Sequence, residues 1–261
     1  MPDSPPTASV LIIGNEVLSG RTQDVNVKFL ATRLGEIGIP LREVRIIPDI
    51  AHVIITTVNE VRARFTYLFT TGGIGPTHDD ITSECVAAAF GVPWEPHPEA
   101  WALLEPRYPP GGFNAARQRM ATMPRGARLI ANPVSIAPGF EIGNVFVMAG
   151  VPEVMRAMFE SLVPRLQHGP RVVSLTVHVT GIPEGTLAEG LGAIQARFPG
   201  LDLGSYPFYR RRGNRDAPER ENGVAVVAKG TDAAAATAAI AEVSELLRRL
   251  GGNPLPGEPS P

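Results

Sequence analysis

The chain of 261 residues is long enough for one large domain or two small ones. Hydrophobic residues make up 44% of it and charged residues 19%, which is typical of an ordinary globular protein. The net charge of −2 provides no field that would gather nucleic acid or an acidic membrane, so we expect neither partner. The single cysteine, Cys85, excludes a disulfide framework within one chain. No signal-peptide pattern or membrane-length apolar run occurs, and we expect a cytoplasmic protein.

Strands and helices alternate over the first two thirds of the chain. Residues 8–13 are a continuous apolar run, typical of a central parallel strand covered on both faces. Helical spacing and β-branched runs then predict a helix at 26–37, a strand at 41–47, a helix at 48–64, a strand at 67–71 and a helix that ends at Gly91. This order predicts βαβ units and an α/β fold of three layers, with helices on both faces of a mostly parallel sheet.

The same domain continues to residue 168. We predict two shorter helices at 96–108 and 113–123, short strands at 128–130 and 139–142, a buried strand at 144–149 and a helix at 153–166. The first domain therefore spans 8–168, and the proline-rich residues 1–7 before it are expected to be disordered.

A second, smaller α+β domain is predicted over residues 169–251. Its pattern gives a strand at 171–180, a helix at 183–198, strands at 201–209 and 223–229, and a helix at 231–250. This β-α-β-β-α order places helices on one face of an antiparallel-type sheet. The charged residues 210–222, with Arg210, Arg211, Arg212 and Arg215, are interpreted as an exposed hairpin loop. Residues 252–261 are expected to be a disordered tail.

The most informative stretch is 67–91, YLFTTGGIGPTHDDITSECVAAAFG. A buried strand leads into Gly72, Gly73 and Gly75, and a helix follows. Glycines allow backbone N–H groups to approach phosphate oxygens, and ligands bind at the carboxyl ends of strands in such sheets. The spacing matches neither the dinucleotide-binding nor the P-loop motif. We name residues 72–76 the glycine loop.

Carboxylates follow several predicted strands. Glu16, Asp49, Asp79 and Asp80 would converge near the glycine loop, because the carboxyl ends of parallel strands share one edge. Acids would repel a phosphate unless a divalent cation lies between them, and Mg²⁺ favours one or two carboxylates plus substrate phosphates. The pattern favours a metal-dependent site.

Plainer interpretations of the polar residues stay open. Helix caps would explain Asp49, Asp80, Thr82 and Asn26. A surface turn would explain Glu16, a turn would explain Asn132 and Ser135, and His78 is either a metal ligand or a solvated loop residue.

At TTGGIGPTHDDIT the sequence resembles the molybdopterin-binding (MoaB/Mog-like) domain family, closest to the N-terminal part of CinA-type proteins. The segments GNEVLSGRTQDVN, RIIPD, NPVSIAPGF and FVMAGVPEVMRAMF support the resemblance over roughly residues 8–166. The later VTGIPEGTLAEGL and LGSYPFYR look like the small domain that follows in CinA-type proteins. Because the C-terminal amidohydrolase domain of that family is not in this sequence, we expect no nicotinamide-nucleotide deamidation.

The resemblance implies roles for particular residues. Asp49 and Asp80 match the family's catalytic acids, with Asp79 as a further metal ligand. The residues expected to bind a phosphate or pterin are Gly14, Asn15, Glu16, Gly72, Gly73, Gly75, Thr77, Thr82, Asn132 and Ser135.

The resemblance also implies an activity. CinA-like relatives are associated with metal-dependent hydrolysis of ADP-ribose-type pyrophosphates, which implies Mg²⁺, Mn²⁺ or Co²⁺ as cofactor. Thr77-His78-Asp79 stands where adenylyltransferases tend to carry a basic residue, which favours hydrolysis over adenylyl transfer. Ala149 and Val154 depart from the CinA-type pattern, so a non-catalytic pterin- or nucleotide-binding protein is the alternative, and a molybdopterin adenylyltransferase is the third. We expect a homo-oligomer, either a dimer or a trimer.

Overall fold

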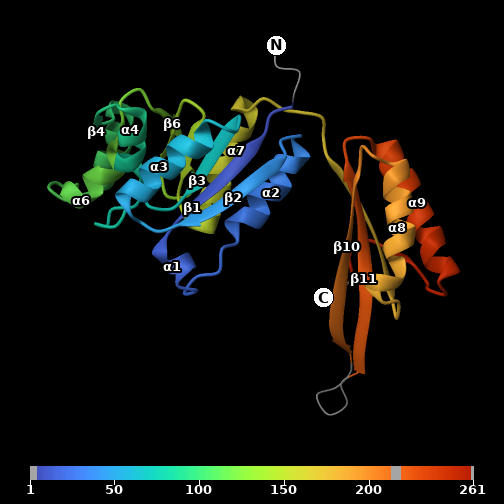
Figure 1. The fold of residues 1–261 in the computed structure, drawn as a ribbon. Helices are drawn as coiled ribbons and strands as arrows, with labels where there is room; N and C mark the ends of the chain where they lie inside the picture. Colours follow the sequence, from blue (N-terminus) through green and yellow to red (C-terminus); the bar gives the residue numbers. More distant parts are fainter. Residues whose placement is uncertain (1–4, 213–218, 260–261) are drawn as a thin grey trace. The chain divides into compact units, whose positions relative to one another are not determined.

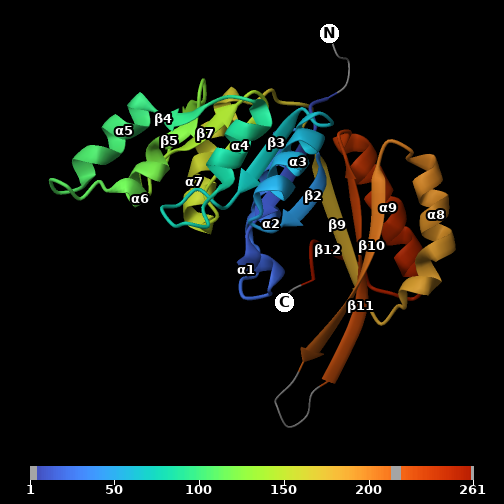
Figure 2. The ribbon, with the colours of Figure 1, turned by 60° about the vertical axis from the view of Figure 1, so that its left-hand side comes forward.

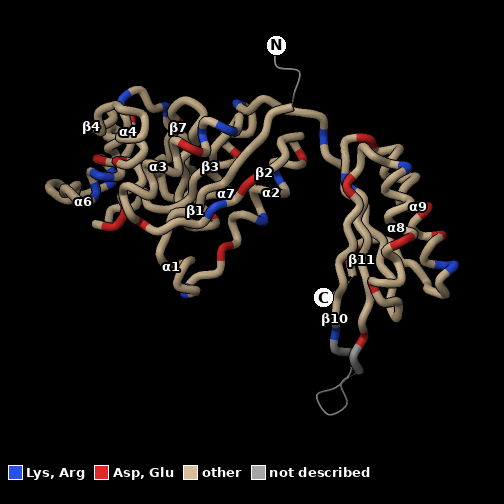
Figure 3. Tube along the Cα trace, viewed as in Figure 1, with Lys and Arg blue, Asp and Glu red and all other residues tan. Residues whose placement is uncertain are grey.

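The structure is a computed structural model that describes residues 5–212 and 219–259. The chain divides into two compact units, Met1–Gly169 and Pro170–Pro261. Figure 3 shows basic and acidic residues interspersed along the trace of both units, in keeping with the net charge of −2. Among the described residues, no helix combines the length and apolar character needed to cross a membrane.

The first unit is built around a six-stranded sheet of order β2-β1-β3-β8-β7-β6 (Figure 1). The pairings among β2, β1, β3 and β8 are parallel, whereas β7 and β6 run antiparallel. The strands of this unit are β1 (Ala8–Ile13), β2 (Leu41–Ile47), β3 (Tyr67–Thr71), β4 (Trp94–Pro96), β5 (Thr122–Pro124), β6 (Arg128–Ile130), β7 (Gly139–Ile142) and β8 (Val145–Met148). Its helices are α1 (Asn15–Leu18), α2 (Asn26–Glu36), α3 (Ala51–Arg62), α4 (Thr82–Phe90), α5 (Pro98–Leu104), η1 (Glu105–Arg107), α6 (Ala115–Gln118), η2 (Arg119–Ala121), α7 (Pro152–Leu162) and η3 (Val163–Arg165).

Strand β1 explains why the sheet is covered on both faces. Its side chains alternate, so Leu11 and Ile13 belong to a core with α3 and α4, whereas Val10 and Ile12 belong to a core with α2 and α7. All six residues of the strand are buried. Burying both faces makes the strand continuously apolar, as the sequence indicates, and the predicted fold class is confirmed.

The parallel strands bring four loops to one edge of the sheet. β2, β1, β3 and β8 are neighbours in that order, so the segments after Ile47, Ile13, Thr71 and Met148 leave the sheet together. Backbone hydrogen bonds continue across this edge: Gly14 N–H donates to Ile47 O at 3.1 Å, and Gly72 N–H donates to Met148 O at 3.2 Å. The predicted glycine loop is therefore held directly against the ends of its neighbours.

The second unit is a four-stranded antiparallel sheet of order β10-β11-β9-β12, and Figure 2 shows α8 and α9 together on one face of it. Val177, Val224 and Val226 are buried against Val243 and Leu247 of α9. The elements of this unit are β9 (Val173–Thr180), η4 (Glu184–Leu187), α8 (Ala188–Arg197), β10 (Asp202–Arg212), β11 (Glu219–Gly230), α9 (Ala233–Arg249) and β12 (Leu255–Pro256).

The described parts of both chain ends are ordered, which corrects the sequence prediction. β12 pairs with β9, and Gly257 N–H donates to Thr176 O at 2.8 Å, so residues 252–259 are not a disordered tail. At the other end, Thr7 N–H donates to Thr66 Oγ1 at 3.1 Å and Thr7 O accepts from Tyr67 N–H at 3.0 Å. Residues 1–4 and 260–261 lie outside the described residues.

Two further predictions differ from the structure. β10 continues to Arg212 and β11 begins at Glu219, so the predicted loop 210–222 is a strand at both of its ends, because each strand extends the ladder with the other. Residues 213–218, with Arg215, lie outside the described part. The predicted helix at 113–123 is limited to the short α6 and η2, because Thr122–Pro124 pairs with Trp94–Pro96 as a strand.

Candidate functional site

Asp49 joins the loops after β2 and β1. Its Oδ2 accepts a hydrogen bond from Asn15 N–H at 2.9 Å. It does not cap the following helix, because α3 has Ile50 at its N-cap and no side-chain cap bond. The cap interpretation of Asp49 is therefore wrong, and its carboxylate is directed toward the start of α1.

The charge environment of Asp49 shows which acids approach it. Burial raises the pKa of Asp49, the Asn15 N–H opposes that rise, and the negative charges of Glu16 and Asp79 add to it. The three carboxylates come from the loops after β2, β1 and β3. The structure thus brings Glu16 and Asp79 each within electrostatic reach of Asp49.

The glycine loop requires glycine at its first two positions. Gly72 has φ +103°, and a Cβ there would lie 2.1 Å from Ile13 O. Gly73 has φ +68°, and a Cβ there would lie 2.1 Å from Thr82 Oγ1. Both positions combine a left-handed backbone with close approach of a neighbouring group. Gly14, by contrast, has an extended backbone at φ 167°.

Asp80 fixes the far part of this loop. Its Oδ2 accepts from Thr77 N–H at 2.8 Å and from the Thr77 hydroxyl, and a Cβ on Gly75 would lie 2.6 Å from the same oxygen. Neither Asp80 nor Thr82 caps α4, whose N-cap is Ile81 without a side-chain bond. Thr82 is fully buried, and its Oγ1 has no hydrogen-bond partner among the described residues.

The structure places a basic side chain, Arg119, near Asp80, and the sequence analysis did not predict it. Arg119 Nη2 donates to Asp80 O at 2.9 Å, and its guanidinium carbon lies 5.1 Å from the centroid of the Trp94 ring. Arg119 lines a small cavity together with Gly75, Asp80 and Ser83. It is 39 residues from Asp80 in the chain and belongs to no recognisable motif, so no local signal could have identified it.

The structure also shows the contacts of three other predicted site residues, Asn132, Ser135 and His78. Asn132 donates to Ser135 Oγ and Ala137 O, both at 2.7 Å, and its Oδ1 accepts from the N–H groups of Val134 and Ser135 at 3.1 Å. These bonds form a closed turn, which supports the turn interpretation of Asn132 and Ser135. The His78 side chain is 97% exposed, and its Nδ1 lies 4.0 Å from Asp79 Oδ1.

A second cavity lies beside Gly72, at the start of α2. Asn26 lines it and donates from Nδ2 to Gly150 O at 2.8 Å. Asn26 is the first residue of α2 rather than its cap, since Val25 is the N-cap. Asp24 takes the capping role, because its Oδ1 accepts from Val27 N–H at 2.9 Å. The cap interpretation of Asn26 is therefore wrong, and Asp24 is a further polar residue of this edge that the sequence prediction did not assign.

The acids of this edge do not form a metal site by themselves in the described part of the chain. Within the part of the chain that the structure describes, no group of three or more His, Cys, Asp or Glu side chains is arranged to hold a metal ion. Mg²⁺ needs only one or two carboxylates when substrate phosphates complete its ligands.

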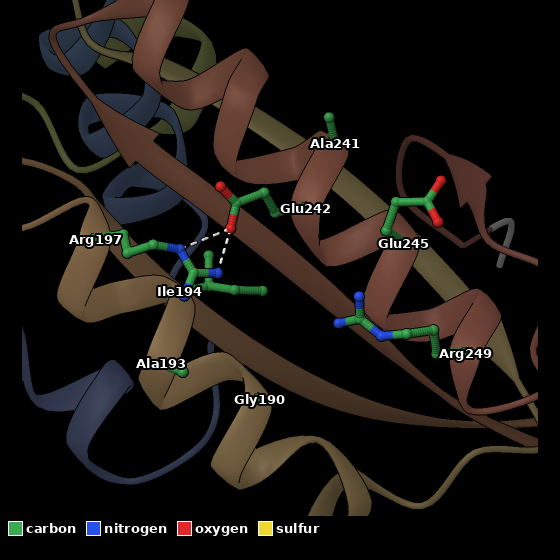
Figure 4. A pocket seen from close by; sticks show the side chains of 8 residues that line it. All are labelled: Gly190, Ala193, Ile194, Arg197, Ala241, Glu242, Glu245 and Arg249. Carbon is green, nitrogen blue, oxygen red and sulfur yellow. Dashed lines mark hydrogen bonds and ion pairs between the residues drawn. The ribbon is translucent and has the colours of Figure 1, made fainter.

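The second unit contains a larger hollow of about 480 Å³ between α8 and α9 (Figure 4). Arg197 and Glu242 point toward each other across it and form an ion pair. Glu245, on the same helix as Glu242, bonds Arg248 at 2.7 Å. No strand-end loop or strained glycine lines this groove, so the candidate site is assigned to the first unit.

Comparisons with known proteins agree with this assignment. A family model described as "Probable molybdopterin binding domain" matches residues 9–168, and one described as "FAD synthase, middle domain" matches residues 171–251. A Pyrobaculum calidifontis protein is 34% identical over 212 residues, covering 77% of this chain and 81% of that protein.

CinA-like proteins are also similar. One from Gloeobacter violaceus is 34% identical, covering 95% of this chain but only 58% of that relative's length. A crystal structure of the protein CinA with unknown function from Thermoplasma acidophilum is 30% identical with a TM-score of 0.57, covering 62% of this chain and 98% of that one. The chain therefore belongs to the molybdopterin-binding (MoaB/Mog-like) domain family, with CinA-like proteins among its homologues.

Proposed function

We propose that the chain binds the phosphates of a nucleotide or pterin at the carboxyl edge of its sheet and hydrolyses a pyrophosphate there. The observation that carries the proposal is the glycine loop, where Gly72 and Gly73 leave no room for a side chain. Such a loop presents bare backbone to a ligand at the start of a helix. The FAD synthase middle-domain match and the CinA-like relatives are consistent with a phosphorylated small-molecule ligand.

The side chains around the glycine loop would have separate roles in binding and hydrolysis. Asp49, partly buried near other acids, would accept a proton from an attacking water. Asp80, held by Thr77, would orient the ligand on the other part of the loop. Arg119, next to the Asp80 carbonyl, would supply positive charge to the phosphates.

We include a divalent cation in this proposal. Asp80, Asp79 and Asp49 would hold Mg²⁺, Mn²⁺ or Co²⁺ together with the substrate phosphates. When bound, the cation would offset the negative charge that gathers on the phosphate oxygens. Glu16, which adds to the negative charge around Asp49, raises the need for such a cation.

Substrate turnover tests this function. Purified protein incubated with ADP-ribose or FAD and each cation should release AMP. Asp49→Asn and Asp80→Asn should each lower the rate by about 100-fold or more, the usual size of a lost acid-base group. Glu99→Gln, an exposed carboxylate in the first turn of α5, is the control and should leave the rate unchanged. Absence of AMP release with every cation would refute the hydrolase.

The second candidate is a non-catalytic pterin- or nucleotide-binding protein. It is favoured by the lack of a three-ligand metal group among the described residues. Val154, one of the departures from the CinA-type pattern, is a buried residue of α7. A ligand-induced rise in Tm without turnover would select this candidate. Molybdopterin-dependent consumption of ATP would instead select an adenylyltransferase.

We also propose a homo-oligomer, a dimer or a trimer, in the cytoplasm. Light scattering of the purified chain measures its mass directly. A mass of one chain, 27.8 kDa, would contradict this part of the proposal.

A further inference from the structure

The cavity beside Gly72 contains a buried hydrogen-bond acceptor without a partner. Asn26 is only 4% exposed, and its Oδ1 has no partner among the described residues. The orientation of the amide is fixed by chemistry, because the Gly150 carbonyl at 2.8 Å can only accept and must face Nδ2. The oxygen is therefore the atom left over. A buried acceptor without a bond costs folding free energy, so it requires an explanation.

The surroundings of Asn26 indicate what would satisfy it. The cavity is also lined by Glu16 and Asp24, and no Lys or Arg is among its lining residues. Phosphate oxygens are acceptors and negatively charged, so they suit neither Oδ1 nor these acids. A neutral group that carries O–H or N–H donors suits all of them. Val17, Val25 and Pro152 add apolar walls against which a ring can pack.

The size and place of the cavity limit the ligand further. Its volume of about 60 Å³ admits roughly four or five water-sized groups, which is one edge of a ring rather than a whole nucleotide. Gly72 and Gly150 both line it, and a Cβ on Gly150 would lie 3.3 Å from Gly72 Cα. The cavity therefore borders directly on the glycine loop, where the phosphates are proposed to bind.

We infer that this cavity is the subsite for a neutral, hydrogen-bond-donating group of the ligand, and that Asn26 Oδ1 is its acceptor. The donor is a sugar hydroxyl or a base N–H adjoining the phosphates. This inference rests on the proposed function, since it extends the ligand from the phosphate position. It gives Asn26 a part in choosing the ligand that is separate from phosphate binding.

The chain offers a matched control in Asn132. Both asparagines are buried, and both donate to a backbone carbonyl, Gly150 O at 2.8 Å and Ala137 O at 2.7 Å. They differ in the oxygen: Asn132 Oδ1 accepts two backbone N–H groups, whereas Asn26 Oδ1 accepts none. Both Asn26→Ala and Asn132→Ala remove a bond to a backbone carbonyl, and Asn132→Ala also removes the other bonds of its turn, but only Asn26→Ala removes a free acceptor.

Isothermal titration with pyrophosphate, ADP-ribose and ribose 5-phosphate tests the inference in the presence of Mg²⁺. Asn26→Ala should weaken ADP-ribose binding by about 10-fold, and pyrophosphate binding should change by about two-fold at most. Asn132→Ala should not separate the two ligands. If Asn26→Ala also weakens ribose 5-phosphate binding, the donor is a sugar hydroxyl. If ribose 5-phosphate binding is unchanged, the donor is a base N–H. Both results support the subsite.

Other outcomes would overturn it. If Asn26→Ala weakens pyrophosphate and ADP-ribose equally, or neither, the subsite is wrong while the phosphate site stands. If the unmodified chain binds none of the three ligands, the proposed function itself fails and the subsite fails with it. Should Asn26→Ala not fold, Asn26→Leu keeps a side chain of similar size without an acceptor and provides the same comparison.

Discussion

The groove of the second unit and the cavity beside Gly72 differ in how their polar groups are satisfied. The groove between α8 and α9 is the larger, yet its facing charges Arg197 and Glu242 neutralise each other. The smaller cavity at the end of the parallel strands keeps Asn26 Oδ1 buried and without a partner among the described residues, and the strained Gly72 borders it. Volume alone would select the groove of the second unit. Unsatisfied groups and backbone that cannot accept a side chain are the better indicators of a ligand site.

The largest effect is expected from adding a methyl group to the glycine loop, which tests whether its backbone excludes a side chain. Gly72→Ala places Cβ 2.1 Å from Ile13 O with φ +103°, and we expect a loss of about 4 kcal/mol in the free energy of unfolding. Gly126→Ala is the control, with φ +83° and open space around its Cβ, and should cost about 1–2 kcal/mol. Urea denaturation measures both. Equal losses would show that the close approach at Gly72 is unimportant.

Removing Arg119 should have the next largest effect. Arg119→Ala loses the bond to Asp80 O and the stacking on Trp94, and we expect a loss of about 2 kcal/mol. Arg125→Ala, which removes an exposed pair with Glu95, should leave Tm almost unchanged. If the two variants have the same Tm, Arg119 does not brace the loop.

Asp49→Asn tests the candidate site through the pH dependence of the protein's stability. Because burial raises the pKa of Asp49 above the ordinary value of an aspartate in the unfolded chain, the folded chain holds more protons than the unfolded chain just above that ordinary value. Stability therefore falls as pH rises through this interval, and the loss is complete above the raised pKa. Asn cannot ionise, so the variant should have the higher Tm at pH 7, and the difference should vanish toward pH 3. A variant that is less stable at pH 7 would contradict this sign.

The smallest effect is expected in the second unit. Arg197→Ala removes an ion pair whose side chains are 55% and 39% exposed, and we expect a loss of about 0.5 kcal/mol or less. A double-mutant cycle with Glu242→Ala measures the coupling. Coupling above about 2 kcal/mol would mean that the groove is more than a solvated surface and would weaken the contrast with the first unit.

The fold was predictable because local pattern and tertiary structure agree in its main elements. β1, with six buried apolar residues, and β2, predicted at 41–47, could be identified from periodicity alone. β12 could not, because two residues beside prolines carry no periodic signal and are ordered only by pairing with β9.

The sequence predicted the parts of the candidate site that directly follow a strand, but not the parts that depend on contacts between distant residues. The glycine loop and Asp49 follow strands directly, so topology places them. Arg119 comes from a distant short helix, and the free oxygen of Asn26 depends on the position of the Gly150 carbonyl, 124 residues away. Sequence patterns do not encode such long-range contacts. Whether the ten residues expected to bind phosphate or pterin do so stays a prediction.

The antiparallel sheet of the second unit ends in proline-bearing strands on both sides. Pro207 lies in β10, opposite Val224, and Pro256 lies in β12, opposite Val177. Proline has no N–H to offer, so each outer strand lacks one donor that an added strand would need. These two prolines are a built-in safeguard against sheet-to-sheet aggregation, and replacing either one should make concentrated solutions more prone to form fibrils.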